Sequence, residues 1–193
     1  MKIIGGAFGG RRLDAPAGTA TRPSAARVRE GVASALDARG LFEGARVLDL
    51  FAGSGALGFE ALSRGAASLV AVDVSPRATR SITDNANTLG VSDRVRVVKG
   101  DLLTRPAAVA TRLAGLESSP FTLVFVDAPY ARLGGVPDLL ARLATAEVFA
   151  ELAVVAVEHP ATTAPSWPVG FSVRGAYRYG DTGVTLLEVA ART

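Results

Sequence analysis

A repeated alternation of short apolar segments and helix-forming segments runs through residues 46–157 and constrains the fold more than any other feature of the chain. The apolar segments are rich in Val, Leu and Phe, so we expect strands at 47–51, 68–73, 95–99, 121–127 and 152–157. We expect helices between them, one passing through 59–62 and another at 76–89. Apolar strands separated by helices are typical of an α/β fold with a parallel sheet covered on both faces.

Two segments near the end of the chain predict a closing pair of strands, at 171–179 and 184–190. The residues between them, Gly180-Asp181-Thr182-Gly183, have the composition of a hairpin turn. At 193 residues the chain is long enough for one domain with a small appendage.

The first 40 residues differ from this pattern and predict a small extension. Residues 2–4 and 11–13 are strand-like and flank a Gly-rich segment, so we expect a β-hairpin. Ser24 follows Pro23 and precedes a helix-forming stretch that ends near Arg39, which makes Ser24 the expected N-cap. We therefore divide the chain into an extension at 1–40 and a larger domain at 41–193.

Positive charge is concentrated in this extension. Residues 1–29 carry six basic side chains and one acidic side chain, whereas the remainder has a net charge of −2, for a total of +3. A basic arm on a nearly neutral body is the pattern expected of a polyanion-binding protein, and the alternative is a solubilising surface. The candidate phosphate contacts are Arg11, Arg12, Arg22, Arg27 and Arg29.

Several classes of protein are disfavoured by what the sequence lacks. It has no Cys, which excludes disulfides, thiolate metal sites and a Cys nucleophile. Its one His, His159, predicts a structural role, and we expect no metal site. No apolar run reaches the roughly 18 residues of a transmembrane helix, and the first residues lack the apolar core of a signal peptide. We expect a cytoplasmic protein with no membrane partner.

A glycine-rich turn follows the first expected strand of the larger domain. Gly53-x-Gly55-x-x-Gly58 stands where this strand gives way to a helix, so backbone N–H groups can approach a ligand closely. The spacing matches the dinucleotide fingerprint, and Asp73 lies about twenty positions later, where an acid that binds ribose belongs. This motif alone fits NAD(P), FAD and S-adenosylmethionine equally well.

Three acidic residues at successive strand ends favour S-adenosylmethionine. A carboxylate at Asp49 would repel a pyrophosphate but attract the ammonium and sulfonium of S-adenosylmethionine. Asp73 is expected to bind both ribose hydroxyls, and Asp101 the adenine amino group. Each acid alone could be a cap or turn residue, but three at one sheet edge indicate a cofactor site. The candidate cofactor-binding residues are Arg22, Asp49, Ala52, Gly53, Ser54, Gly55, Asp73, Asp101 and Leu102.

The segment Asp127-Ala128-Pro129-Tyr130 ends the fourth expected strand and predicts a catalytic site for an exocyclic amine. Pro129 favours an extended Ala128 whose carbonyl is free. Asp127 and that carbonyl would accept the two N–H bonds of the amine and turn its lone pair toward the methyl group. Tyr130 would stack on a base that is unstacked or flipped out. The alternative is a turn that merely ends a strand.

These motifs occur together in a known family, and the chain resembles the RsmD family of bacterial 16S ribosomal RNA (guanine-N2)-methyltransferases. The similarity covers the run VLDLFAGSGALGFEALSRG at 47–65 and the segment at 127–130. It also covers shorter segments, namely Ile3-Ile4-Gly5-Gly6, Gly10-Arg11-Arg12-Leu13, Thr21-Arg22-Pro23-Ser24, Arg27-Val28-Arg29-Glu30 and Tyr179-Gly180-Asp181-Thr182. Two differences are Ala128, where the family usually has a second Pro, and Ser24, where Thr is usual.

The resemblance implies a Rossmann-like class I S-adenosylmethionine-dependent methyltransferase with a seven-stranded mixed sheet whose last strand is antiparallel. It implies methyl transfer to N2 of a guanine in 16S rRNA, within a small-subunit assembly particle, by a monomer. The extension would grip the RNA, and the Arg22-Pro23 segment would fold over the cofactor.

Three alternatives remain open on the sequence alone. An NAD(P)-dependent oxidoreductase fits the glycine-rich turn but gives no reason for the Asp127 segment. A DNA adenine or cytosine amino-methyltransferase shares the chemistry, although 193 residues leave little room for a DNA-recognition domain. A non-catalytic RNA-binding module fits the basic arm but gives no reason for the cofactor acids.

Overall fold

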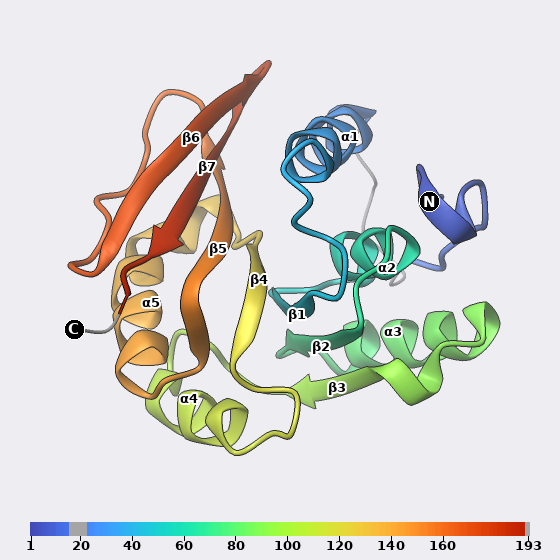
Figure 1. The fold of residues 1–193 in the computed structure, drawn as a ribbon, viewed down its shortest axis with the longest axis horizontal. Helices are drawn as coiled ribbons and strands as arrows, with labels where there is room; N and C mark the ends of the chain where they lie inside the picture. The colour runs from blue at the N-terminus through green and yellow to red at the C-terminus, as the bar shows by residue number, and fades with distance from the viewer. Residues whose placement is uncertain (16–22, 192–193) are drawn as a thin grey trace.

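One seven-stranded sheet forms the centre of the molecule (Figure 1). The computed structural model describes residues 1–15 and 23–191. The strands are β1 (Arg46–Leu50), β2 (Ser68–Asp73), β3 (Val95–Lys99), β4 (Phe121–Val126), β5 (Phe149–Pro160), β6 (Phe171–Tyr179) and β7 (Thr182–Val189). The α-helices are α1 (Pro23–Asp37), α2 (Ala56–Ser63), α3 (Pro76–Leu89), α4 (Pro106–Ala114) and α5 (Val136–Thr145). Short 3-10 helices occur at η1 (Gly6–Phe8), η2 (Ser92–Arg94) and η3 (Tyr130–Gly135).

The order of the strands places a switch point in the middle of the sheet. The order is β3-β2-β1-β4-β5-β7-β6, with β1 to β5 parallel and β7 antiparallel to both of its neighbours. From β1 the chain continues to one side of the sheet, and from β4 it continues to the other. Ligands of such sheets bind at this switch point, outside the carboxyl ends of the strands. The predicted Rossmann-like mixed sheet with an antiparallel last strand is confirmed.

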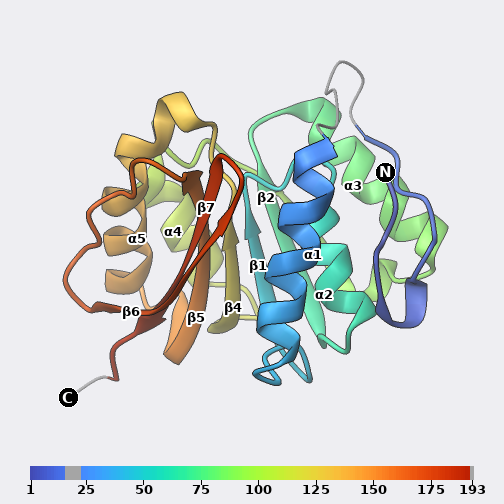
Figure 2. The ribbon, with the colours of Figure 1, turned by 90° about the horizontal axis from the view of Figure 1, so that it is seen from above.

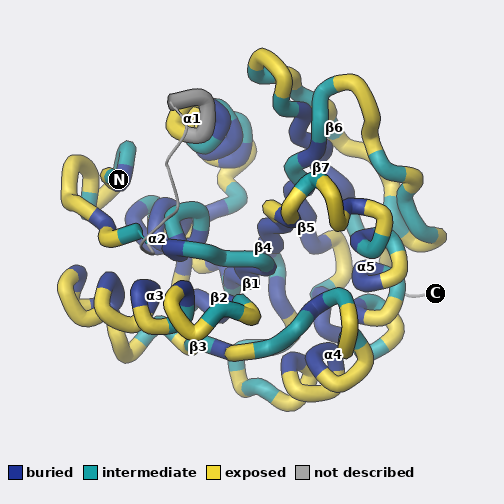
Figure 3. Tube along the Cα trace, turned by 180° about the vertical axis from the view of Figure 1, so that it is seen from behind, coloured by how far each residue is buried: buried dark blue, intermediate teal, exposed yellow. Residues whose placement is uncertain are grey.

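Side chains that alternate along the strands divide the core into two layers. Figure 2 shows α1 and α2 on one side of the sheet and α4 and α5 on the other. In β1, Val47 faces the layer that contains α1, α2 and α3, whereas Leu48 faces the layer of α4 and α5. Both side chains are fully buried because the sheet is covered on both faces, as the continuous apolar strands predict. Figure 3 shows the central strands buried and the outward sides of α3 and α4 exposed.

The N-terminal segment and α1 pack on the same core as the sheet. Ile3, Leu13 and Val28 are buried in the layer of α2 and α3, together with Val47 of β1. The described residues of the extension therefore share one hydrophobic layer with the sheet. The division of the chain at residue 40 stays a prediction.

Helix α3 begins and ends where the sequence predicts. Ser75 accepts a hydrogen bond from the N–H of Ala78 at 3.4 Å, Pro76 stands in the first turn, and Gly90 ends the helix with a φ of 74°. By contrast, α4 and α5 lie in segments for which the sequence predicted no helix boundaries. None of the helices within the described ranges is long and apolar enough to cross a membrane.

One prediction for the extension is confirmed and another is wrong. Residues 1–3 and 10–13 form the predicted hairpin: an antiparallel bridge joins Lys2 to Arg12, the N–H of Ile3 donates to the carbonyl of Arg11 at 3.0 Å, and the N–H of Leu13 donates to the carbonyl of Met1 at 2.9 Å. Gly6 has a φ of 73° and lies directly against Ser63, so the loop of the hairpin, which contains η1, packs on α2. Helix α1 begins at Pro23, so Ser24 lies inside the first turn and is not the N-cap. Proline is favoured at this first helical position.

Candidate cofactor and acceptor site

The glycine-rich turn after β1 has a left-handed backbone at three positions. Phe51, Gly53 and Gly55 have φ values of 62°, 57° and 77°. The N–H of Ala52 donates to the carbonyl of Val72 at 3.0 Å, and the N–H of Gly55 donates to the carbonyl of Ala52 at 2.7 Å. A left-handed Phe costs about 1–3 kcal/mol, and such strain gathers at ligand sites. This turn is therefore the first candidate for ligand contact.

Gly53 borders open space at the edge of the sheet. A Cβ at Gly53 would meet no atom within 4 Å, whereas a Cβ at Gly55 would meet Phe59 at 2.8 Å. The N–H of Gly53 donates to Asp73 Oδ2 at 2.9 Å, which joins the turn to the end of β2. Gly53 thus leaves room for a ligand beside the backbone, while Gly55 is required by packing.

Asp49 is the most buried of the predicted cofactor acids. Its side chain is 1% exposed and accepts a hydrogen bond from the N–H of Gly58 at 3.0 Å. Burial raises the pKa of the Asp49 carboxyl to about 7, the Gly58 hydrogen bond opposes this rise, and the charges of Asp127 and Asp73 add to it. The three carboxylates interact, so this edge of the sheet has a negative potential that favours a cationic ligand.

Backbone N–H groups hold the other two predicted cofactor acids. Asp73 Oδ1 accepts from the N–H of Ser75 at 2.8 Å, and its second oxygen binds the glycine-rich turn. Asp101 Oδ1 accepts from the N–H groups of Leu103 and Thr104, both at 3.1 Å. Hydrogen bonds from Thr104 and Leu103 lower the pKa of the Asp101 carboxyl. A carboxylate has about four lone-pair sites, so both acids keep capacity for ligand donors.

The groups at this edge suit S-adenosylmethionine better than a dinucleotide. The acids offer acceptors for ribose hydroxyls and an adenine amino group, and their charge suits a sulfonium and an ammonium. The same carboxylates would repel a pyrophosphate. Leu102 is buried beside Asp101, as a residue that lines an adenine site would be. Val74 is 51% exposed directly after Asp73 and offers an apolar surface, although no pattern in the sequence predicts this role.

The predicted acceptor segment lies at the end of β4, next to β1. Asp127 is exposed, and its N–H donates to the carbonyl of Leu50 at 3.4 Å, so the segment starts beside the glycine-rich turn. Ala128 is buried, and Pro129 follows with φ −52° and ψ 129°. No donor in the described part of the chain binds the carbonyl of Ala128. The segment therefore presents a carboxylate and a carbonyl oxygen at the switch point.

Tyr130 is anchored at its hydroxyl by two residues of other strands. Its Oη lies 3.2 Å from Glu158 Oε1 and 3.1 Å from Thr182 Oγ1. Burial raises the pKa of the Tyr130 hydroxyl above its ordinary value. Neither partner was among the predicted site residues. For Thr182 the only sign in the sequence is its place in the segment at 179–182 that carries the family resemblance.

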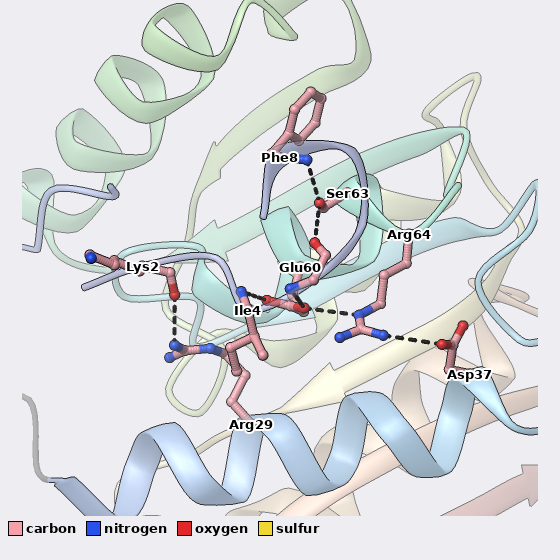
Figure 4. Close-up of polar contacts among 9 residues, drawn as sticks. Lys2, Ile4, Phe8, Arg29, Asp37, Glu60, Ser63 and Arg64 are labelled. Atoms are coloured by element: carbon pink, nitrogen blue, oxygen red, sulfur yellow. Dashed lines mark hydrogen bonds and ion pairs between the residues drawn. The ribbon is translucent and has the colours of Figure 1, made fainter. Parts of the chain in front are cut away.

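The N-terminal segment is fixed to α2 through its backbone (Figure 4). Glu60, which is 1% exposed, accepts hydrogen bonds from the N–H groups of Ile4 at 2.7 Å and Gly5 at 3.0 Å. Arg64 Nε pairs with the same carboxylate at 2.9 Å. A buried carboxylate is tolerated only when it is paired and hydrogen-bonded, and these three donors satisfy that condition. The position of the segment therefore depends on α2.

Asn85 of α3 joins the N-terminal segment to the glycine-rich turn. It is 2% exposed, and its Oδ1 accepts from the N–H of Asp14 at 2.8 Å. Its Nδ2 donates to the carbonyls of Asp14 at 2.9 Å and Ser54 at 3.1 Å. Ser54 is buried, and its hydroxyl donates to Met1 Sδ at 3.2 Å. One satisfied amide thus holds both the segment and the turn.

Two of the predicted RNA-contacting arginines are used inside the fold. Arg11 donates to the carbonyls of Thr88 at 2.6 Å and Leu89 at 3.3 Å, at the end of α3. Arg29 donates to the carbonyl of Lys2 at 2.9 Å, and burial lowers the pKa of its guanidinium. These contacts favour a structural role for both side chains.

Of the other three predicted arginines, two are exposed and one lies outside the described residues. Arg12 and Arg27 are exposed, and neither forms an ion pair with a residue in the ranges 1–15 and 23–191. Arg12 lines a surface hollow of about 410 Å³ together with Lys2. Arg22, predicted to contact both cofactor and RNA, lies outside the described residues. Arg12 and Arg27 are therefore exposed and without an ion pair in these ranges, whereas Arg11 is exposed but bound to the end of α3.

His159 lies in the core and not at the site. Its ring nitrogens lie 2.9 Å from Thr185 Oγ1 and 2.8 Å from the carbonyl of Pro160. The ring centre is 6.2 Å from that of Trp167. These contacts agree with the structural role expected of this residue.

Relatives of known name share most of the chain. A family model described as conserved hypothetical protein 95 matches residues 1–188. YlbH of Bacillus subtilis strain 168, whose name assigns it provisionally to the rRNA methyltransferases, is 34% identical over 189 residues, which are 97% of this chain and 98% of that protein. Ribosomal RNA small subunit methyltransferase D of Escherichia coli K12 is 36% identical over 132 residues, which are 68% of this chain and 61% of that protein.

Solved structures agree with these relatives. The Escherichia coli protein yhhF, named provisionally as a methyltransferase, has a TM-score of 0.79 and 31% identity and covers 100% of this chain and 99% of its own. A hypothetical protein of Thermus thermophilus has a TM-score of 0.76 and 30% identity, with 99% of each chain covered. The chain thus belongs to the family described as conserved hypothetical protein 95, which is the RsmD family that its sequence resembles.

Proposed function

We propose that the protein transfers a methyl group from S-adenosylmethionine to N2 of a guanine in 16S ribosomal RNA. The observation that carries the proposal is the meeting of three carboxylates, those of Asp49, Asp73 and Asp127, beside the open space at Gly53. A negative edge suits a cationic cofactor, and an exposed Asp127 suits an amine that donates hydrogen bonds. The names of the two curated relatives support ribosomal RNA as the substrate.

The cofactor residues act by binding and by charge. S-adenosylmethionine, when bound, supplies an electrophilic methyl group on its sulfonium. Asp73 binds the ribose hydroxyls, and Asp101 accepts from the adenine amino group. Asp49 acts through its charge and through its hold on α2, because its carboxylate is buried against Gly58. The remaining proposed contacts are the turn residues Ala52, Gly53, Ser54 and Gly55, with Leu102 and Arg22.

The acceptor residues orient a weak nucleophile. The lone pair of an exocyclic amine is delocalised into the base, so the nitrogen reacts only when this lone pair is turned toward the methyl group. Asp127 and the carbonyl of Ala128 accept the two N–H bonds, Pro129 holds that carbonyl in place, and Tyr130 stacks on the flipped-out base. Orientation and exclusion of water then supply most of the rate enhancement.

The RNA is held outside the acceptor site by the basic extension. Arg12 and Arg27 contact phosphates, with Arg22 as a further contact, while Arg11 and Arg29 shape the segment that presents them. The acceptor is a small-subunit assembly particle, and the protein acts on it as a cytoplasmic monomer.

The test uses labelled S-adenosylmethionine with three acceptors. These are small subunits from a strain that lacks the protein, naked 16S rRNA, and duplex DNA. The expected result is label in rRNA, recovered as N2-methylguanine, with the small-subunit particle as the better acceptor. Label in DNA alone, or a cofactor that binds without any methyl transfer to RNA, would overturn the ribosomal assignment.

A further inference from the structure

The segment Tyr179-Gly180-Asp181-Thr182 carries part of the family resemblance, and the proposed function gives it no role. In the structure this segment is the turn between β6 and β7. Gly180 has a φ of 65°, and β7 starts at Thr182, two residues earlier than the sequence predicts. Because the turn ends there, the side chain of Thr182 occupies the first position of the strand, where its Oγ1 lies 3.1 Å from the hydroxyl of Tyr130.

The ladder between β5 and β7 brings a second group to the same place. Thr182 pairs with Pro160, and Glu158 lies two residues before Pro160 on β5. Paired residues project to the same face of a sheet, and so do residues two apart, so Glu158 and Thr182 project together. Glu158 Oε1 lies 3.2 Å from the Tyr130 hydroxyl. Both contacts cross long stretches of chain, because Tyr130 is 28 residues from Glu158 and 52 from Thr182.

The proton count fixes the direction of both hydrogen bonds. A carboxylate only accepts, so Tyr130 donates its one hydroxyl proton to Glu158. The hydroxyl of Thr182 must then donate to the Tyr130 oxygen. The phenol is therefore both a donor and an acceptor, and its far end is fixed at two points.

An aromatic ring that stacks on a base must leave one face open, so packing on both faces cannot fix its plane. The hydroxyl oxygen lies on the axis about which the ring turns, so an anchor at this oxygen fixes the direction of that axis. Because a phenol prefers to donate and accept in the plane of its ring, two partners at the hydroxyl also favour one ring plane and leave a face free. We propose that Thr182 and Glu158 are positioning residues that fix the plane of the Tyr130 ring for the acceptor base. This inference rests on the stacking role given to Tyr130 in the proposed function.

The test is a double-mutant cycle on the full chain, with the small-subunit particle and labelled S-adenosylmethionine. Thr182→Val is expected to lower kcat/KM by about three- to tenfold, the effect of one lost hydrogen bond, and Tyr130→Phe, which loses the bonds to both Glu158 and Thr182, by at least as much. The double variant should be no slower than Tyr130→Phe alone, because both changes break the same contact. Thr182→Ser, which restores the hydroxyl, should return within about twofold of the parent rate.

A matched control lies on the same strand. Thr185→Val removes a hydrogen bond to His159, on the other face of β7. In the double variant with Tyr130→Phe, the two fold-changes in kcat/KM should multiply, as they do for independent sites. Binding of S-adenosylhomocysteine should stay unchanged in all variants at position 182. The proposal is overturned if Thr182→Val keeps the parent rate, if its effect multiplies with that of Tyr130→Phe, or if Thr182→Ser fails to restore activity.

Tyr130→Ala separates this inference from the proposed function. If Tyr130→Ala keeps the parent turnover, the stacking role itself is wrong, and the inference falls with it. If Tyr130→Ala is strongly impaired while Thr182→Val is normal, the ring acts without its anchor, and only the inference is wrong.

Discussion

At the scale of single residues, the buried Asp49 carboxyl makes the candidate cofactor site sensitive to pH. Its pKa is about 7 in the folded protein, against an ordinary value of 3.8. At a pH between 3.8 and about 7, the Asp49 carboxyl is ionised in the unfolded chain but still protonated in the folded protein. The unfolded state then binds fewer protons, so Asp49 makes the stability of the ligand-free protein fall as pH rises from about 4 to about 7.

The ionisation of Asp49 also predicts how the affinity for S-adenosylmethionine depends on pH. The positive charges of S-adenosylmethionine favour ionised Asp49, so affinity should increase by about three- to tenfold as pH rises from about 5.5 to about 7.5. Asp49→Asn should remove most of this dependence. Isothermal titration calorimetry at a series of pH values measures the affinity of the parent protein and of Asp49→Asn. A parent affinity that does not change with pH would contradict the role of Asp49.

Asp127 predicts a separation of binding from turnover. Because we propose that Asp127 binds the amine and not the cofactor, Asp127→Ala should lower turnover by about a hundredfold or more and leave cofactor affinity nearly unchanged. Asp127→Asn is the matched control, since its amide oxygen still accepts one hydrogen bond and should retain more activity. Single-turnover methyl transfer and cofactor titration together measure both quantities, and near-normal turnover in Asp127→Ala would remove this residue from the mechanism.

The candidate site could be predicted in part from single residues. Asp73, Asp101 and Asp127 each end a strand, and strand ends in a parallel sheet meet at one edge, so their convergence follows from the sequence pattern. Thr182 could not be predicted in this way. Its contact with Tyr130 depends on where β7 starts, and the composition of the turn at 180–183 left that start open by two residues.

At the scale of elements, the N-terminal segment is held by the backbone of its glycines. A Cβ at Gly6 would overlap the carbonyl oxygen of Ser63, whereas a Cβ at Gly10 would meet nothing within 4 Å. Both glycines have a left-handed φ, of 73° and 81°. Gly10→Ala should therefore cost about 1–2 kcal/mol from backbone strain alone. Gly6→Ala should cost about 1–3 kcal/mol more, because the segment must move off α2.

Chemical denaturation of the two variants measures this difference. The midpoint should fall further for Gly6→Ala than for Gly10→Ala, and the two variants differ only in the space around the new methyl group. Equal midpoints would mean that docking on α2 contributes nothing to stability.

A second prediction at the scale of elements concerns Asn85 of α3, which we expect to contribute to stability. In Asn85→Asp, an oxygen replaces the amide nitrogen that binds the carbonyls of Asp14 and Ser54, so three acceptors face one another in the core. The cost should be about 1–3 kcal/mol of stability, with weaker cofactor binding because Ser54 belongs to the glycine-rich turn. Asn87→Asp, whose side chain is exposed and contacts Ser92, is the control on the same helix. Comparable thermal shifts in the two variants would contradict this prediction.

Elements with local signals could be predicted, and elements defined by distant contacts could not. Helix α3 has its cap at Ser75 and its stop at Gly90, so its bounds follow from the sequence. The hairpin predicted for residues 2–13 is present, but its Gly-rich sequence indicates a turn without showing what the turn packs against. The partner of this segment on α2 is Glu60, which lies 56 residues from Ile4, and no local pattern encodes that contact.

At the scale of the whole molecule, the arginines of the extension have two roles. Arg11 and Arg29 bind backbone carbonyls of the fold, and the others are candidates for RNA contact. Arg12 and Arg27 face solvent, so Arg12→Ala with Arg27→Ala should weaken RNA binding and reduce the slope of log K against log salt by about 1.4–1.8. Arg142→Ala is the control, because Arg142 pairs with Asp138 on α5, which covers the other face of the sheet. Filter binding across a salt series measures the slopes, and an unchanged slope in the double variant would remove both arginines from the interface.

The fold of the whole molecule follows from the strand–helix alternation, because apolar strands separated by helices have few stable arrangements. The contacts of residues 1–15 do not follow from it, and they have a consequence for synthesis. Gly5 binds α2 from 55 residues away, Asp14 binds α3 from 71, and Arg11 reaches the end of α3 from 77. Residues 1–15 leave the ribosome before α2 and α3, so they find their place only after these helices have been made. A nascent chain therefore cannot display its finished basic surface before the helices beside the candidate cofactor site are complete.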